Sequence, residues 1–130
     1  AKNVRLHAAG SFYMQLVNCA GMCLFGAMTR RLPLVEYFNA VTGWDLSADA
    51  YFKTGERILS LRKAFNAREG IRPEDHILSG RAIGETPLAS GPLKGVTIDI
   101  QNLREEFFKV VGWDVATGGP TPYKMKDLGI

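Results

Sequence analysis

The sequence has few of the residues that bind metals. Its 130 residues include two cysteines, Cys19 and Cys23, and two histidines, His7 and His76. Two cysteines cannot complete a four-ligand zinc site, and the histidines do not stand at the spacing of a zinc finger. These residues therefore do not form a self-contained zinc centre.

Long hydrophobic runs and targeting signals are also absent. The longest apolar candidate, residues 20–28, is shorter than a membrane span and is followed by Arg30 and Arg31, which we expect to end a helix. The chain begins Ala-Lys-Asn, with no signal peptide, transit pattern or initiator methionine. Two cysteines without a secretory signal are typical of a reducing compartment. We therefore expect a cytoplasmic piece of a longer chain, without a membrane span.

No charge of one sign dominates the sequence. The net charge is +3, and basic residues such as Lys53 and Arg57 stand among acidic ones such as Glu56. This distribution is typical of a solvated helix face, whereas a nucleic-acid binder would show a basic stripe. The length and a hydrophobic content of 46% predict one folded domain over residues 1–130. We expect no nucleic-acid partner.

The periodicity of apolar residues predicts an all-α, mainly helical fold. The longest helix is expected at residues 47–69, with Ser47 as its N-cap and an apolar stripe, including Phe65, that we assign to the core. Gly55 lowers helix propensity there and is expected to let another helix approach closely. Shorter helices are predicted after a poorly patterned lead-in, residues 1–10; they cover residues 11–17 (capped by Ser11), 33–41, 99–111 (capped by Asp99) and 121–128.

A long connection rich in glycine and proline, residues 71–98, separates two of these helices. Residues 72–75 indicate a turn or a single helical turn, and residues 96–98 could form a short edge strand. Connections of this length are usually functional or wrapped over a partner surface. The whole is an irregular multi-helix domain with one long amphipathic helix and one long Gly/Pro-rich connection.

The histidines and tryptophans have structural explanations. His7 has no sequence neighbour that could orient it, and the adjacency of Asp75 and His76 does not make a catalytic pair. The tripeptide Gly-Trp-Asp occurs twice, as Gly43-Trp44-Asp45 and Gly112-Trp113-Asp114. Each copy is expected to end a helix and anchor the next turn. For the first tryptophan we favour packing in the core over stacking on a cofactor.

Both cysteines lie in one glycine-containing apolar segment, residues 18–27. Gly21 argues against a continuous helix, so we expect a turn between two short apolar helices. A cysteine on such a turn can direct its thiolate away from the chain. From the residue types alone, two small buried cysteines in a helical core are favoured. The alternative is one cysteine ligand of an iron–sulfur cluster that is completed elsewhere.

The order of short motifs resembles a known family. Residues 18–23, Asn-x-x-Gly-Met-Cys, are similar to the second pterin-binding motif, Asp-x-x-Gly-Leu-Cys, of the tungsten-containing aldehyde:ferredoxin oxidoreductase family. Matching runs follow in the order of that family's C-terminal domain, so the resemblance extends from about Ser11 to Ile130. They are Glu36–Asp45, Gly55-Glu56-Arg57-Ile58, Phe65–Gly70, Glu85-Thr86-Pro87-Leu88 and Gly112-Trp113-Asp114.

The resemblance implies cofactors that this segment holds only in part. In that family a tungsten or molybdenum atom is held by two pterins, beside a 4Fe-4S cluster that passes electrons to ferredoxin. Cys23 would be the last thiolate ligand of the cluster, Gly21 would admit the pterin, and Asn18 and Met22 would contact it. Asn18 replaces the usual aspartate, which keeps a polar contact and removes its charge.

The family's catalytic residues and its other cluster cysteines lie upstream of this segment. The isolated fragment is therefore expected to hold no cofactor and to be inactive. Its implied partners are the upstream domains of the same chain and ferredoxin or another electron-transfer subunit. The substrate could be an aldehyde or an aromatic acyl thioester. The alternative to an oxidoreductase domain is a non-catalytic helical interaction module.

Overall fold

Helices are the regular secondary structure of the described part of the chain. The computed structural model describes residues 2–29 and 31–130, so Arg30 of the predicted helix end lies outside them. Across these residues there is no strand, and no helix is long and apolar enough to cross a membrane. The prediction of an all-α fold is confirmed. The helices are α1 (Lys2–Cys19), α2 (Leu24–Met28), α3 (Leu34–Thr42), α4 (Ala48–Arg68), α5 (Gly80–Ile83), α6 (Ile100–Val111) and α7 (Pro122–Leu128), with a 3-10 turn at Pro73–Asp75.

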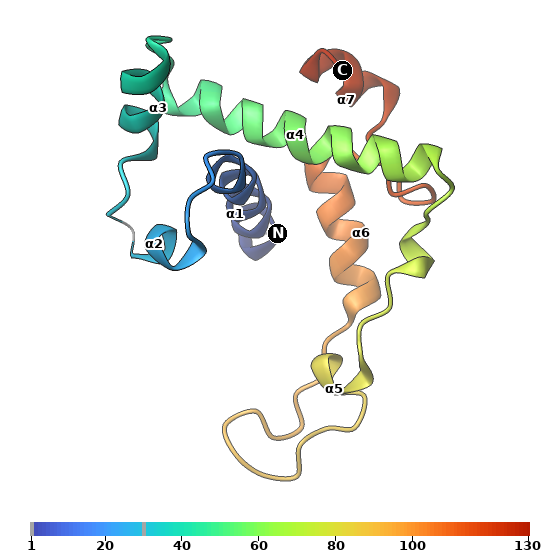
Figure 1. Ribbon diagram of the computed structural model, residues 1–130. Coiled ribbons are helices and arrows are strands. Elements are labelled where there is room, and N and C mark those ends of the chain that lie inside the picture. Colours follow the sequence, from blue (N-terminus) through green and yellow to red (C-terminus); the bar gives the residue numbers. More distant parts are fainter. Residues whose placement is uncertain (1, 30) are drawn as a thin grey trace.

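Two long helices, α1 and α4, cross at the centre of the molecule. In Figure 1 α4 runs across the view while α1 is seen nearly end-on. Gly55 lies at the crossing point: a Cβ atom there would come within 2.9 Å of the carbonyl carbon of Phe12. Real side chains do not tolerate such a distance to backbone, so only glycine permits this crossing. The predicted close approach at Gly55 is confirmed.

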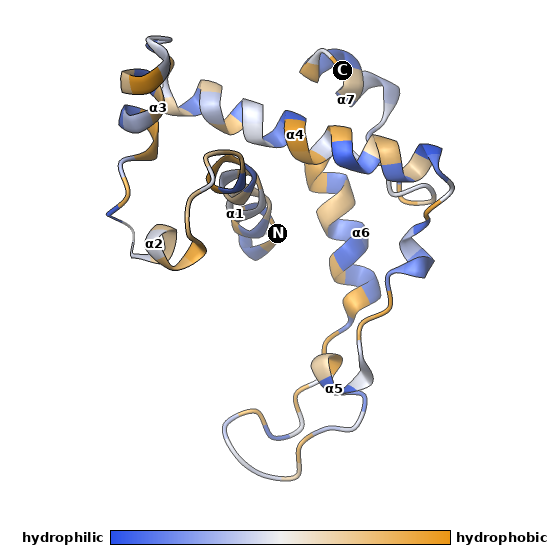
Figure 2. Ribbon diagram, in the orientation of Figure 1, coloured by the Kyte–Doolittle hydropathy of each residue, from blue (hydrophilic) through white to orange (hydrophobic). Residues whose placement is uncertain are grey.

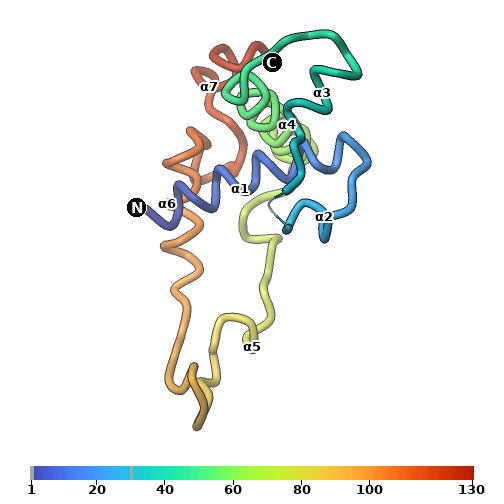
Figure 3. The backbone as a smooth tube through the Cα atoms, turned by 90° about the vertical axis from the view of Figure 1, so that its left-hand side faces the viewer, coloured from blue at the N-terminus to red at the C-terminus, as the bar shows by residue number. Residues whose placement is uncertain are grey.

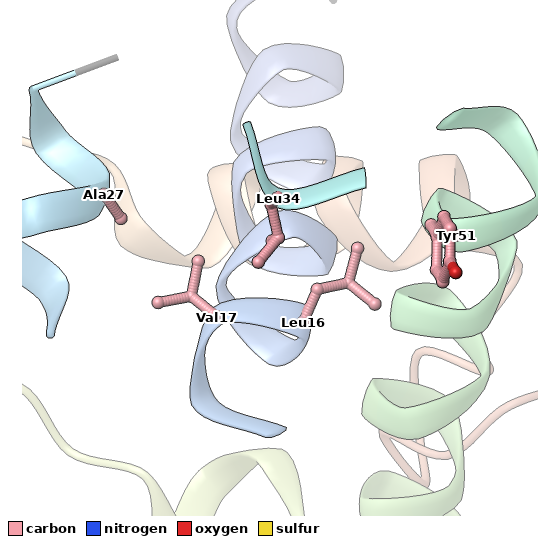
Figure 4. Packing of buried hydrophobic residues seen from close by; sticks show 5 residues of the cluster. All are labelled: Leu16, Val17, Ala27, Leu34 and Tyr51. Carbon is pink, nitrogen blue, oxygen red and sulfur yellow. The ribbon is translucent and has the colours of Figure 1, made fainter. Parts of the chain in front are cut away.

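The buried side chains form two small cores at the two ends of α1. Near its C-terminal end, Leu16 and Val17 meet Leu34 of α3 and Tyr51 of α4, and Ala27 of α2 completes the cluster (Figure 4). Near its N-terminal end, Ala8 packs on the C-terminal part of α6 and on Trp113, which is 4% exposed. Helix α1 therefore ties the two halves of the fold together.

The prediction for the beginning of the chain is wrong. Residues 2–10, expected to be a poorly patterned lead-in, are the first half of α1, and no helix begins at Ser11. The Ser11 hydroxyl instead donates to the carbonyl oxygen of His7 within the helix, at 2.9 Å. Burial of Val4 and Ala8 stabilises a segment whose sequence has weak periodicity, since tertiary packing outweighs local propensity.

The N-caps predicted at Ser47 and Asp99 are confirmed, because their side chains accept hydrogen bonds from the backbone N–H of Ala50 and Asn102. Thr121, predicted only as the start of the last helix, caps α7 in the same way by accepting the N–H of Lys124. The helical turn predicted at residues 72–75 is confirmed as the 3-10 turn. The edge strand predicted at residues 96–98 is wrong, because these residues pair with no neighbouring strand.

The apolar stripe of α4 is only partly core. Tyr51, Gly55 and Ser60 are buried, whereas Leu61 and Phe65 are more than half exposed. The two Gly-Trp-Asp tripeptides also differ: Gly43 and Gly112 both end their helices in the left-handed conformation, but Trp44 is 62% exposed. The prediction that Trp44 packs in the core is wrong, because this chain places no cover over it.

A long arm leaves the helices and returns to α6. It consists of residues 76–99, carries the short helix α5, and extends away from the α1–α4 crossing (Figure 3). Hydrophobic residues are scattered along the arm and on α2 (Figure 2). Ile77, Leu88 and Leu93 are each more than half exposed. Most of the predicted Gly/Pro-rich connection therefore projects away from the packed helices.

Candidate functional site

The segment Asn18–Cys23 forms a well-defined helix-ending turn. The N–H of Met22 donates to the carbonyl oxygen of Val17, and the N–H of Gly21 donates to that of Asn18, both at 3.1 Å. Gly21 is left-handed, with φ of 65°. This pair of bonds is the Schellman motif, in which the residue after the glycine contacts the preceding helical turn. Met22 makes that contact with the Leu16–Val17 core.

Cys23 stands immediately after this turn and begins α2. It is the N-cap residue, but its side chain makes no capping hydrogen bond. Both Cys19 and Cys23 are free and exposed. The interpretation favoured from residue types alone, two buried cysteines in a helical core, is therefore wrong. The turn between helices is confirmed, although the preceding helix is long.

The surface around Cys23 is open and largely apolar. Phe25 and Met28 of α2 are more than two-thirds exposed. Side chains of α1 and α2, including Met14 and Met28, line a hollow of about 340 Å³ between the two helices. A Cβ atom on Gly21 would meet no heavy atom within 4 Å. Gly21 is therefore favoured by its backbone conformation, and no described residue lies beside the position of an added Cβ.

The other predicted contact, Asn18, is also exposed. Within residues 2–29 and 31–130 its side-chain amide has no hydrogen-bond partner. An amide without a partner can still accept one hydrogen bond and donate others to a bound molecule. The structure thus brings Asn18, Gly21, Met22 and Cys23 onto one turn, with three of them exposed and Met22 half-buried.

The described part of the chain does not form a metal site of its own around Cys23. No group of three or more histidine, cysteine or carboxylate residues there could hold a metal ion. His7 packs edge-on against Phe107, with ring centroids 5.4 Å apart. The Asp75 carboxylate accepts the N–H of Arg72 at 2.6 Å, so it serves the 3-10 turn rather than His76. Both histidine predictions agree with these contacts.

Sequence reasoning missed the polar residue that shapes the loop after α3. The Asn39 side chain donates to the carbonyl oxygen of Leu46 at 2.9 Å and accepts its N–H at 3.0 Å. The same amide oxygen accepts the hydroxyl of buried Tyr51 at 2.7 Å. The only sequence signal was a lone asparagine within an apolar helix, Leu34–Thr42, close to its glycine end.

Two ionisable groups have shifted pKa values away from the turn. Partial burial lowers the pKa of Lys63, whose Nζ lies 3.5 Å from Nε2 of His76. The backbone N–H of Thr117 donates to the Asp114 carboxylate at 2.8 Å and holds the pKa of that carboxyl below its usual value. Neither residue is near Cys23 in the sequence, and the contacts just described account for both pKa shifts.

Comparison with known proteins identifies the family. The family described as "Aldehyde ferredoxin oxidoreductase, domains 2 & 3" matches residues 2–130. The chain is 35% identical over 119 residues to the tungsten-containing aldehyde ferredoxin oxidoreductase of Pyrococcus furiosus, and equally identical to that of Thermococcus kodakarensis. It is 33% identical over 118 residues to that of Pyrococcus abyssi. Each alignment covers 88% of this chain but 19% of the relative.

The chain thus spans about a fifth of the length of the curated relatives that it matches. The match includes the Asn18–Cys23 turn, the α1–α4 crossing and the arm, because it extends over all the described residues. It confirms the resemblance that the ordered motifs indicated. This chain belongs to the aldehyde ferredoxin oxidoreductase family.

Proposed function

We propose that this chain is the C-terminal, cofactor-facing part of a bis-pterin oxidoreductase containing tungsten or molybdenum. The reaction is the oxidation of an aldehyde to a carboxylic acid with ferredoxin as electron acceptor, or the related reduction of an aromatic acyl thioester. The observation that carries the proposal is the free, exposed Cys23 on a rigid turn, in a chain whose relatives are named as tungsten enzymes.

The chemistry of Cys23 fits one ligand of a 4Fe-4S cluster. Cluster iron favours thiolate sulfur, and the Cys23 side chain is not engaged in a disulfide or in capping α2. Since no group of three or more potential ligands is found in the described residues, the other three thiolates would come from the rest of the polypeptide. The bound metal would supply two-electron chemistry, and the cluster would conduct the electrons.

The turn before Cys23 fits a pterin contact. Gly21 leaves open space on its outer side, and the backbone there is fixed by the two bonds of the Schellman motif. The unpartnered amide of Asn18 offers both a donor and acceptors to the N–H and carbonyl groups of a pterin ring. Met22 anchors the turn to the core from its inner side. A fixed backbone orients a cofactor at little entropic cost.

The size of the exposed surface supports a role within a larger protein. The accessible surface of this chain is 9226 Å². A free-standing protein of 14.3 kDa exposes about 6,800 Å² by the usual scaling with mass. The excess of about 2,400 Å² exceeds what one partner buries in a standard protein interface, about 800 Å². The remaining domains of the same polypeptide are the proposed cover.

The direct test is the composition of the native protein, purified from its source without oxygen. Its intact chain mass is measured together with its iron, tungsten and molybdenum content. A chain far heavier than 14.3 kDa that carries iron with tungsten or molybdenum supports the proposal. A native chain of this mass without metal would overturn it and leave the non-catalytic helical interaction module. Electron transfer to ferredoxin on adding aldehyde or aromatic acyl thioester then assigns the substrate.

A further inference from the structure

The loop between α3 and α4 presents Trp44 in a fixed position. Gly43 ends α3 in the left-handed conformation, and Asp45 is the one residue other than glycine with positive φ, 51°, among the described residues. Asn39 then holds Leu46 through two hydrogen bonds. Positive φ in a residue with a side chain is uncommon and needs such support from its surroundings. The loop is therefore rigid while its tryptophan is 62% exposed.

The tryptophan of the second Gly-Trp-Asp tripeptide, Trp113, is buried by other parts of this chain. Trp113 also follows a left-handed glycine, but it is 4% exposed, packs on Phe107 and Phe108, and donates its ring N–H to Ser60. A left-handed glycine thus precedes both tryptophans, of which one is in the core and the other at the surface. Trp44 differs in that no described element of this chain buries its ring.

Three other exposed apolar residues lie close to Trp44 in the sequence. Tyr37 and Val41 lie four residues apart on α3, hence on one face, and they are 47% and 86% exposed. We call Tyr37, Val41, Trp44 and Leu46 the Trp44 patch. The surrounding residues 32–52 contain Glu36, Asp45 and Asp49 but no lysine or arginine. The patch is therefore apolar, and the charged residues of its own segment are all acidic, in a chain whose net charge is +3.

We propose that the Trp44 patch docks into an apolar pocket with a basic border on the same oxidoreductase polypeptide, outside residues 1–130. This inference rests on the proposed function, because it requires the chain to be part of that longer protein. The relatives are about five times as long as the aligned segment, so protein is available to cover the patch. Tryptophan and tyrosine are the residues that most often anchor interfaces.

A second copy of this chain is a poorer occupant. A symmetric contact between two patches would bring the three carboxylates of each segment 32–52 toward those of the other, and that segment has no basic residue to offset them. Like charges facing each other across an interface oppose association. A basic border on the partner complements Glu36, Asp45 and Asp49 instead.

Hydroxyl-radical footprinting of the native, metal-loaded polypeptide tests this docking, with oxidation read separately for each tryptophan by peptide mass spectrometry. Trp113 supplies the buried reference and the unfolded protein supplies full reactivity. We expect Trp44 to react as slowly as Trp113. Fast oxidation of Trp44 in a protein that holds its metals and is active would overturn the docking while leaving the proposed function intact. Protection that disappears when the protein is diluted would also overturn it, in favour of a second copy.

A matched pair of variants tests whether Trp44 is the anchor. Trp44→Ala should expose Tyr37 to oxidation, and Trp44→Phe should keep it protected. Trp113 reports in each variant whether the helices remain folded. Truncating a strong interface anchor weakens docking by roughly 30-fold. We therefore expect the rate of Tyr37 oxidation in Trp44→Ala to rise at least about tenfold over the unmodified protein. Unchanged protection of Tyr37 in both variants would refute the anchoring role.

Discussion

The crossing of α1 and α4 gives a sharp prediction for Gly55→Ala. A Cβ atom there would lie 2.9 Å from the carbonyl carbon of Phe12, a backbone atom that cannot rotate away. The helices α1 and α4 would have to separate, and overpacking of this kind costs about 3 kcal/mol. Alanine regains about 1 kcal/mol of helix propensity. The crossing should therefore lose about 2 kcal/mol of stability.

Hydrogen exchange of the native polypeptide measures this loss locally. Amide exchange follows the free energy of local opening, so 2 kcal/mol corresponds to roughly 30-fold faster exchange in the peptides of α1 and α4. Gly10→Ala is the matched control, because Gly10 is also inside a helix but has no heavy atom within 4 Å of the added Cβ. It should slow exchange by about fivefold, from the same propensity gain. Equal or slower exchange in Gly55→Ala would refute the reasoning.

Three further predictions concern local contacts. Asn39→Ala leaves the Tyr51 hydroxyl without its partner and should destabilise the following loop by about 2–3 kcal/mol, seen as faster amide exchange at residues 43–47. Gly21→Asn keeps a residue that tolerates positive φ but adds a side chain to the open outer side, so helix content should stay while bound tungsten or molybdenum falls. The carboxyl of Asp114 has a lowered pKa in the folded turn. Its contribution to folding stability is therefore complete above the unfolded pKa of about 3.9 and is lost as the pH falls through the folded pKa. An NMR titration of this carboxyl, compared with the Thr117→Pro variant that lacks the N–H donor, checks the direction of the shift.

The parts of the fold that the sequence predicted are those decided by neighbouring residues. The N-termini of α4, α6 and α7 are set by three capping residues, Ser47, Asp99 and Thr121. Each capping side chain accepts a hydrogen bond from the backbone N–H three residues later. The helical turn at residues 72–75 depends likewise on a local bond between Asp75 and Arg72. Such contacts are visible in a single sequence because they need no knowledge of distant segments.

The parts that could not be predicted depend on distant segments. The first half of α1 is stabilised by packing of Ala8 on α6, about a hundred residues away in the sequence. Trp44 and Phe65 are exposed because no distant segment of the described chain packs on them. The local sequence pattern is the same for a buried and for an exposed aromatic residue, so it could not predict this. The Asn39 contacts also escaped prediction, because one asparagine in an apolar helix does not reveal its partners.

The candidate site shows the same division. The break at Gly21 was predictable, since glycine disfavours a helix interior and is common after a helix end. The exposure of both cysteines was not, because cysteine is usually buried and nothing local distinguishes the two cases. The roles of Asn18, Gly21, Met22 and Cys23 toward cofactors remain predictions from the family resemblance.

The iron content of two cysteine variants tests the central claim most directly. Cys19 and Cys23 are both free and exposed and stand at the two ends of one turn, so either can be replaced by serine without loss of packing. Each variant of the native polypeptide is purified without oxygen, and iron is measured per chain. The account predicts that Cys23→Ser loses cluster iron while Cys19→Ser retains it. Full iron in Cys23→Ser, or equal loss in both variants, would contradict the assignment of Cys23 as a cluster ligand.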